Sequence, residues 1–263
     1  MTPLDHAHAA MQAAENSDTA DAARLHYYQH LADGELFVLL TQEATGETIS
    51  PELFDLDQGR FVLAFDQQER LAAFSGQVSP YAAISGRVLA QMLDGQGIGL
   101  GVNIDVAPSS YLIPPEAIGW LNQTLAQTPD AVAARIDHFS APLDPPAILL
   151  PALEAKLANA GGLVQAAYLV DVAYQGGGRG ALLGFVGAPE PAQEALAKAV
   201  SEALTFAGIG AGAVDVGFFA FDDSRAGKLA AHGRKLYLPP PPEPSEHSRA
   251  VPGSDPAKPP ILR

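Results

Sequence analysis

The sequence contains no cysteine in 263 residues. Disulfide scaffolds, cysteine-based zinc sites, iron–sulfur clusters and thiol catalysis are therefore excluded together. Basic residues are also scarce, because 15 lysines and arginines stand against 30 aspartates and glutamates, for a formal net charge of −15. Binding to nucleic acid or to an anionic membrane surface depends on clustered basic residues, so we expect neither.

Long apolar runs are missing as well. The strongest apolar clusters are residues 36–40 and 148–153, far short of the roughly 18 residues that a membrane-spanning helix needs. No basic residue precedes Arg24, so the start of the chain does not resemble a secretory signal. Since 48% of the residues are hydrophobic and 17% are charged, the composition is that of a folded protein, and we expect it in the cytoplasm.

The negative charge is concentrated in the first half of the chain. Residues 1–130 hold 17 acids and four arginines, a net charge of −13, whereas residues 131–263 hold 13 acids and 11 bases, a net charge of −2. The first lysine is Lys156. This imbalance is typical of a domain that contacts a basic partner and equally of one kept soluble by self-repulsion, and both interpretations stay open.

Apolar spacing and turn residues predict an α+β protein of two small domains with mixed sheets. Residues 1–127 form the first domain, which begins with a surface helix or a helical pair broken near residues 16–18. Asp66 is the expected N-cap of the helix over residues 66–76, and Glu69 is expected to complete a capping box with it. The remaining expected elements of this domain are strands at 35–40, 53–56, 60–65, 97–103 and 110–113 and helices at 66–76, 84–93 and 114–125.

Residues 131–238 predict a second domain with the split β-α-β order of ferredoxin-like folds. Its expected elements are strands at 134–139, 164–174, 181–186, 213–221 and 235–238 and helices at 151–160, 189–206 and 225–232. Residues 239–263 contain nine of the 22 prolines. Such a composition favours polyproline II and cannot bury enough apolar surface to fold alone, so we expect a disordered tail.

The glycine-rich segments lack the fingerprints of nucleotide binding. After Gly97 and Gly99 the third glycine of a dinucleotide motif is replaced by Val102, and no helix is expected to begin there. Residues 176–180 and Gly227 are not followed by the Gly-Lys-Ser or Gly-Lys-Thr of a phosphate-binding loop. We interpret residues 97–101 as a strand against which neighbours pack closely, with a ligand pocket over that strand as the alternative.

Histidine offers the one argument for a metal. His26 and His30 are four residues apart and share a helix face. No glutamate follows His26, as it does the first histidine of a zinc hydrolase. An exposed polar helix face explains the pair better than a metal does, so we assign no metal and no cofactor. The pair Asp55 and Asp57 fits a hairpin turn better than acid–base catalysis, and we expect no enzyme.

Three residues are candidates for an interaction surface. Tyr81 ends a Gly/Ser/Pro loop between two expected helices, Asn103 ends the glycine strand, and Trp120 lies one helix later. Aromatic side chains near loops can anchor a protein partner, although the same rings can close a small core instead.

Residues 30–125 resemble the N-terminal domain of the SseB family, named for enhanced serine sensitivity. The resemblance is carried by LFVLL at 36–40, FVLAFD at 61–66, ERL at 69–71, Phe74, residues 99–103 and LIPPE at 112–116. Residues 163–174 and 236–238 resemble the family's second domain more weakly. The resemblance implies a bacterial α+β protein without established catalytic residues. We therefore expect a non-catalytic protein-binding or regulatory module with a basic protein partner, and the alternative is a small-molecule binder or enzyme with its pocket over residues 97–101.

Overall fold

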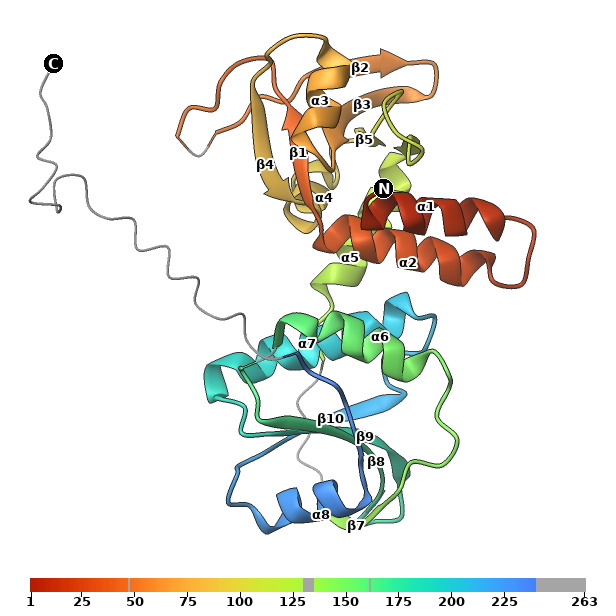
Figure 1. Ribbon diagram of the computed structural model, residues 1–263, viewed down its shortest axis with the longest axis vertical. Coiled ribbons are helices and arrows are strands. Elements are labelled where there is room, and N and C mark those ends of the chain that lie inside the picture. The colour runs from red at the N-terminus through yellow and green to blue at the C-terminus, as the bar shows by residue number, and fades with distance from the viewer. Residues whose placement is uncertain (47, 130–134, 161, 240–263) are drawn as a thin grey trace, which may run out of the picture.

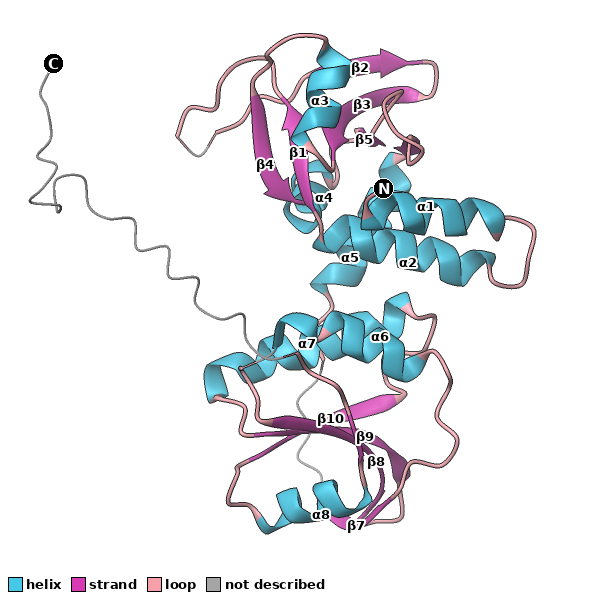
Figure 2. Ribbon diagram, viewed as in Figure 1, coloured by secondary structure: helices cyan, strands magenta, loops and turns pink. Residues whose placement is uncertain are grey.

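The computed structural model describes residues 1–46, 48–129, 135–160 and 162–239. The chain forms two sheets, each flanked by helices, and the two units are stacked one above the other in Figures 1 and 2. We call residues 1–129 the N-terminal lobe and residues 135–239 the C-terminal lobe. The predicted α+β class is confirmed. The predicted proline-rich tail falls, apart from its first residue, outside the described residues.

The N-terminal lobe is built on a mixed sheet of strand order β4-β1-β3-β5-β6, and β2 pairs with β3. Strands β3 and β5 are parallel, and the other pairs are antiparallel. The elements of this lobe are α1 (Pro3–Ala13), α2 (Ala20–Asp33), β1 (Glu35–Leu39), β2 (Leu53–Leu56), β3 (Gly59–Phe65), α3 (Gln68–Ser75), β4 (Tyr81–Ser85), α4 (Gly86–Leu93), β5 (Gly99–Val102), β6 (Tyr111–Ile113) and α5 (Pro115–Ala126).

Helices cover both faces of this sheet. The larger core lies between the sheet and helices α1, α2, α4 and α5, with Val38, Val62 and Leu121 among its buried residues. A smaller core on the opposite face holds Leu63 and Leu71, which join β3 to α3. Because both faces are covered, β3 is an almost continuous apolar run rather than an alternating one.

The predicted helical pair at the start of the chain is confirmed, but it is not a surface element. Helix α1 buries Leu4 and His8, and helix α2 buries Tyr27, Tyr28 and Leu31. Tyrosine, histidine and alanine form most of the buried stripe. Because these helices contain few large aliphatic residues, the sequence pattern predicted them to be more exposed than they are.

The helix predicted over residues 84–93 begins at Gly86, because the residues before it form a strand. Strand β4 pairs with β1 over five residues, from Glu35 opposite Ser85 to Leu39 opposite Tyr81. Ser85 then caps α4 by accepting a hydrogen bond from the Val88 amide at 3.4 Å. A side chain at Gly86 would meet the Leu31 carbonyl oxygen, so glycine lets α4 approach α2.

The C-terminal lobe contains a second sheet of strand order β10-β9-β8-β11, with β7 also paired to β8. Helices α6 and α7 pack on one face and α8 on the other. Its elements are β7 (Ile136–Ser140), α6 (Leu149–Lys156), the 3-10 helix η1 (Ala158–Ala160), β8 (Ala166–Tyr174), β9 (Arg179–Val186), α7 (Glu190–Phe206), β10 (Val214–Phe219), α8 (Ser224–His232) and β11 (Arg234–Lys235).

The ferredoxin-like strand order predicted for this lobe is not observed. In a split β-α-β arrangement another strand separates the two parallel strands. Here β9 and β10 are direct parallel neighbours, from Ala181 opposite Val214 to Val186 opposite Phe219. Strand β7 pairs antiparallel with β8 at the sheet's other side. The order of elements along the chain was predicted correctly, but it is compatible with more than one pairing.

Candidate functional site

The three residues predicted to form an interaction surface lie in three separate places. Tyr81 begins the edge strand β4 and packs edge-to-face on Phe37, with ring centroids 5.6 Å apart. Asn103 follows β5, two strands further across the sheet from β1. Trp120 lies on α5 and contacts Tyr28, with ring centroids 5.5 Å apart. They therefore do not share one surface, and Tyr81 is not on a loop between helices.

Asn103 is fully buried, so the prediction that it lies on an exposed surface is wrong. Its backbone is left-handed, with φ of 51°, and its side chain turns inward. The amide nitrogen Nδ2 donates to Ser109 Oγ at 2.8 Å, and Oδ1 accepts from the Asp66 amide at 3.1 Å. The carboxamide thereby connects the end of β3 to the loop between β5 and β6.

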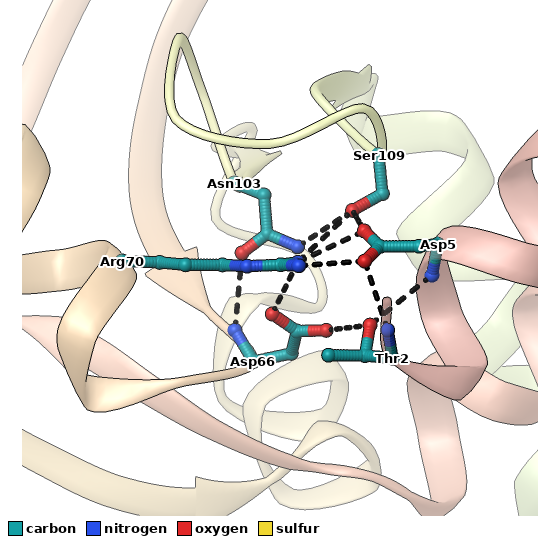
Figure 3. Close-up of polar contacts among 6 residues, drawn as sticks. All are labelled: Thr2, Asp5, Asp66, Arg70, Asn103 and Ser109. Carbon is teal, nitrogen blue, oxygen red and sulfur yellow. Dashed lines mark hydrogen bonds and ion pairs between the residues drawn. The ribbon is translucent and has the colours of Figure 1, made fainter.

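Asn103 belongs to a buried polar cluster that joins the first helix to the sheet (Figure 3). We call it the Asp5–Arg70 cluster. Its side chains come from the N-terminus, α1, the β3–α3 connection, α3 and the β5–β6 loop, and its members are Thr2, Asp5, Asp66, Arg70, Asn103 and Ser109.

The centre of the cluster is a two-pronged ion pair. Arg70 Nη1 and Nη2 donate to the two carboxylate oxygens of Asp5 at 2.9 and 2.6 Å, and Nη1 also donates to Asp66 at 2.9 Å. The side chain of Asp5 is 0% exposed and that of Arg70 is 13% exposed. The Arg70 guanidinium, helped by hydrogen bonds from Ser109 and the Thr2 backbone, holds the pKa of the Asp5 carboxyl well below its usual range although burial opposes this.

Local sequence explains how these groups meet. Thr2 caps α1 through a capping box, in which the Thr2 hydroxyl accepts from the Asp5 amide and the Asp5 carboxylate accepts from the Thr2 amide. Asp66 does not cap α3 as predicted, since the N-cap position is Gln67. Instead the Asp66 carboxylate accepts from the Thr2 hydroxyl at 2.5 Å and from Arg70.

The cluster is a structural connection rather than an open site. Each carboxylate oxygen of Asp5 and Asp66 accepts at least one hydrogen bond from within the cluster. A buried charge pair that is fully hydrogen-bonded fixes geometry and leaves no ligand position free. The arrangement therefore anchors α1 and the β5–β6 loop to the sheet. Spacing along the chain gave no signal for it, because its members span more than 100 residues.

The alternative of a ligand pocket over residues 97–101 is wrong. A side chain at Gly99 would lie 2.4 Å from the Phe61 ring, and one at Gly101 would lie 2.5 Å from a Leu63 methyl group. Every residue of β5 is buried. The glycines are present because side chains from β3 occupy the space above them, as the close-packing interpretation predicts.

Trp120 marks the junction between the lobes. Its ring contacts Phe206 of α7 edge-to-face at a centroid distance of 6.5 Å. Phe206 is buried within the core of the N-terminal lobe although it belongs to the C-terminal lobe. In Figure 1, α5 and α2 lie next to α7 and α6 at this junction.

A cluster of four charged residues crosses the same junction, and we call it the junction ion cluster. Asp33 and Arg87 come from the N-terminal lobe, and Lys156 and Glu202 come from the C-terminal lobe. Arg87 contacts Asp33 at 2.9 Å and Glu202 at 3.1 Å, and Lys156 contacts them at 2.7 and 2.8 Å. Although burial works against it, the hydrogen bonds from Arg87 and Lys156 lower the pKa of Glu202.

Beside this cluster is a groove of about 990 Å³ between α2, α6 and α7. His26 and His30 lie on its α2 wall, with ring centroids 4.5 Å apart. Burial, together with the nearby His26, lowers the pKa of His30. Within the ranges that the structure describes, no group of three or more histidine or carboxylate side chains is placed to hold a metal ion.

These features define a two-lobed α+β protein in which a buried polar cluster holds the first helix against the sheet and a partly buried ion cluster joins the two lobes. Residues 8–120 match the family model described as the SseB protein N-terminal domain. The match covers less than half of the 263 residues, so the similarity is between this N-terminal region and that domain. The match ends at residue 120, so the weaker resemblance of the second half to the family's second domain stays a prediction.

No curated protein and no solved structure matches the chain significantly. In the portion of the chain that the structure describes, no helix combines the length and apolar character needed to cross a bilayer.

Proposed function

We propose that this chain, whose residues 8–120 are similar to the SseB N-terminal domain, is a non-catalytic protein-binding module of the bacterial cytoplasm, and that its N-terminal lobe binds an extended basic segment of a partner protein along the free edge of β2. The proposal rests on the charge state of that lobe and on the exposure of that strand.

The observation that carries the proposal is that all four arginines of the N-terminal lobe are paired within the chain. Arg24 contacts Asp21 at 2.7 Å and Arg60 contacts Asp55 at 3.0 Å. Arg70 is held in the Asp5–Arg70 cluster and Arg87 in the junction ion cluster. Since residues 1–130 contain no lysine, the unpaired charge on this lobe is negative. A positively charged partner is the one that such a surface attracts and steers.

Strand β2 supplies a place for that partner. Among the described strands it pairs only with β3, so its other edge has free backbone donors and acceptors. Leu53 and Leu56 are each 44% exposed. Glu52 and Asp57 flank the strand, and neither has an ion pair among the described residues. An added strand gains main-chain hydrogen bonds from such an edge, and the flanking acids would select lysine or arginine beside it.

Acidic residues beside an edge strand can also serve only to prevent aggregation, because charged side chains at sheet edges disfavour pairing with other chains. Lysine serves that purpose as well as glutamate does. Reversing the sign of the flanking charges therefore separates the two interpretations.

The test is a pull-down from bacterial lysate with three immobilised chains: the wild type, the Glu52→Lys/Asp57→Lys variant and the Glu190→Lys/Glu194→Lys variant. The last changes two acids that are exposed on α7 of the C-terminal lobe, so both variants have the same net charge. We expect a basic protein that the wild type and the α7 variant retain and that the β2 variant loses. Retention of no protein above background, or equal retention by all three chains, would refute the proposal.

A further inference from the structure

The groove between α2, α6 and α7 has the size and lining of a small-molecule site, and it lies apart from β2. Its volume of about 990 Å³ is at the upper end of the range typical of ligand pockets. Alanines form much of its walls, so the helices face one another across open space instead of filling it with side chains. These alanines include Ala22, Ala23, Ala152, Ala155, Ala195 and Ala199.

The groove is cationic in a chain whose net charge is −15. Its two acids, Asp33 and Glu202, are matched by Arg87 and Lys156 in the junction ion cluster. Lys198 is a third cation in the lining, and no described residue forms an ion pair with it. The groove therefore has one positive charge that the described residues do not neutralise.

The position of Lys198 fits the capture of an anion at the groove wall. It lies on α7 one turn before Glu202, and His26 and His30 lie on the facing helix α2. An imidazole can donate a hydrogen bond to a carboxylate beside the lysine. Lys156, whose ammonium lies 5.9 Å above the Phe206 ring, also lines the groove, but Asp33 and Glu202 neutralise its charge.

We propose that this groove binds an amphipathic carboxylate, with its apolar body against the alanine walls and its carboxylate at Lys198. The apolar walls account for a hydrocarbon body and the unmatched lysine accounts for the negative head. Because α2 belongs to one lobe and α6 and α7 to the other, a bound ligand would contact both lobes.

The test uses decanoate as the probe and isothermal titration calorimetry as the assay on the full chain. Decanol has the same body without the charge, and acetate has the charge without the body. We expect decanoate to bind at one site and each comparison compound to bind at least tenfold more weakly. Decanol binding as tightly as decanoate, or no decanoate binding at millimolar concentration, would overturn the proposal.

Variants place the site. Lys198→Met should weaken decanoate binding about tenfold, and Ala199→Leu, which fills the groove, should weaken it further. Lys228→Met is the matched control, since Lys228 is exposed on α8 and does not line the groove. Far-ultraviolet circular dichroism and Trp120 fluorescence confirm that each variant is folded. Unchanged decanoate affinity in both groove variants would place binding elsewhere and refute the assignment.

Discussion

Replacing Arg70 with methionine removes the guanidinium from the Asp5–Arg70 cluster while keeping an unbranched side chain of similar length. Asp5 is then left fully buried without its positive partner, and Asp66 loses one of its donors. Removing one member of a buried ion pair typically costs about 3–5 kcal/mol, because an uncompensated charge stays in the interior. We expect the free energy of unfolding of Arg70→Met to fall by about that amount at pH 7.

The matched control is Arg24→Met. Arg24 and Asp21 form an ion pair of similar length, but both side chains are largely exposed, and such surface pairs contribute about 0–1 kcal/mol. Urea unfolding followed by circular dichroism measures both variants. A loss in Arg70→Met no larger than the loss in Arg24→Met would refute the view that the cluster anchors α1 to the sheet.

The difference in stability between the wild type and Arg70→Met should also depend on pH. The folded-state pKa of Asp5 is depressed, so the stability that Asp5 contributes is present above its unfolded pKa of about 3.9 and is lost as the pH falls toward the folded value. In Arg70→Met the buried carboxyl has no cation, so acid relieves its penalty by protonation. The gap between wild type and variant should therefore narrow by about 1 kcal/mol between pH 7 and pH 3.5. A gap that widens with acid would contradict the assignment.

Three further variants test the packing. Tyr27→Phe should leave the free energy of unfolding in urea unchanged or raise it by up to about 1 kcal/mol, because the Tyr27 hydroxyl is buried and bonds to no described group. A loss of more than about 1 kcal/mol would show that the hydroxyl does form a hydrogen bond in the folded protein. Gly99→Ala should cost about 1–3 kcal/mol by overpacking against Phe61, whereas Gly210→Ala, which has open space around it, should be neutral; equal effects would refute close packing at β5. Phe206→Ala should lower the free energy of unfolding by about 3–5 kcal/mol and shift the emission of Trp120 to the red, because water reaches the lobe junction. Phe221→Ala is the control, since it removes an exposed ring. An unchanged Trp120 spectrum in Phe206→Ala would contradict the packing of Phe206 against Trp120.

The sequence predicted most secondary structure because apolar periodicity and turn residues are local signals. The hairpin between β2 and β3 and the helix α7 are examples. Strand β4 was missed because Tyr81–Ser85 is a short edge strand, in which alanine and serine give a weak pattern. The strand order of the C-terminal lobe was predicted wrongly because it depends on contacts between distant segments rather than on the order of elements along the chain.

The two polar clusters could not be predicted from the sequence either, because their members come from segments that are distant along the chain. Asp5, Arg70 and Ser109 come from three elements, and only the fold brings them together. Asp66 did show a local signal, the spacing of a capping box, but a buried arginine competes more strongly for its carboxylate than a helix amide does. For His26 and His30 the spacing correctly placed both rings on one face, yet the groove beside them depends on α6 and α7.

Hydrogen exchange at β2 tests the proposed binding mode most directly. Mass spectrometry would compare exchange in the chain alone and in complex with the basic protein that it retains. The proposal predicts slower exchange within residues 53–56 in the complex, because an added strand accepts hydrogen bonds from the alternate amides that do not bond to β3. It predicts unchanged exchange at the edge strand β4, Tyr81–Ser85. Unchanged exchange at residues 53–56, with protection elsewhere, would contradict it.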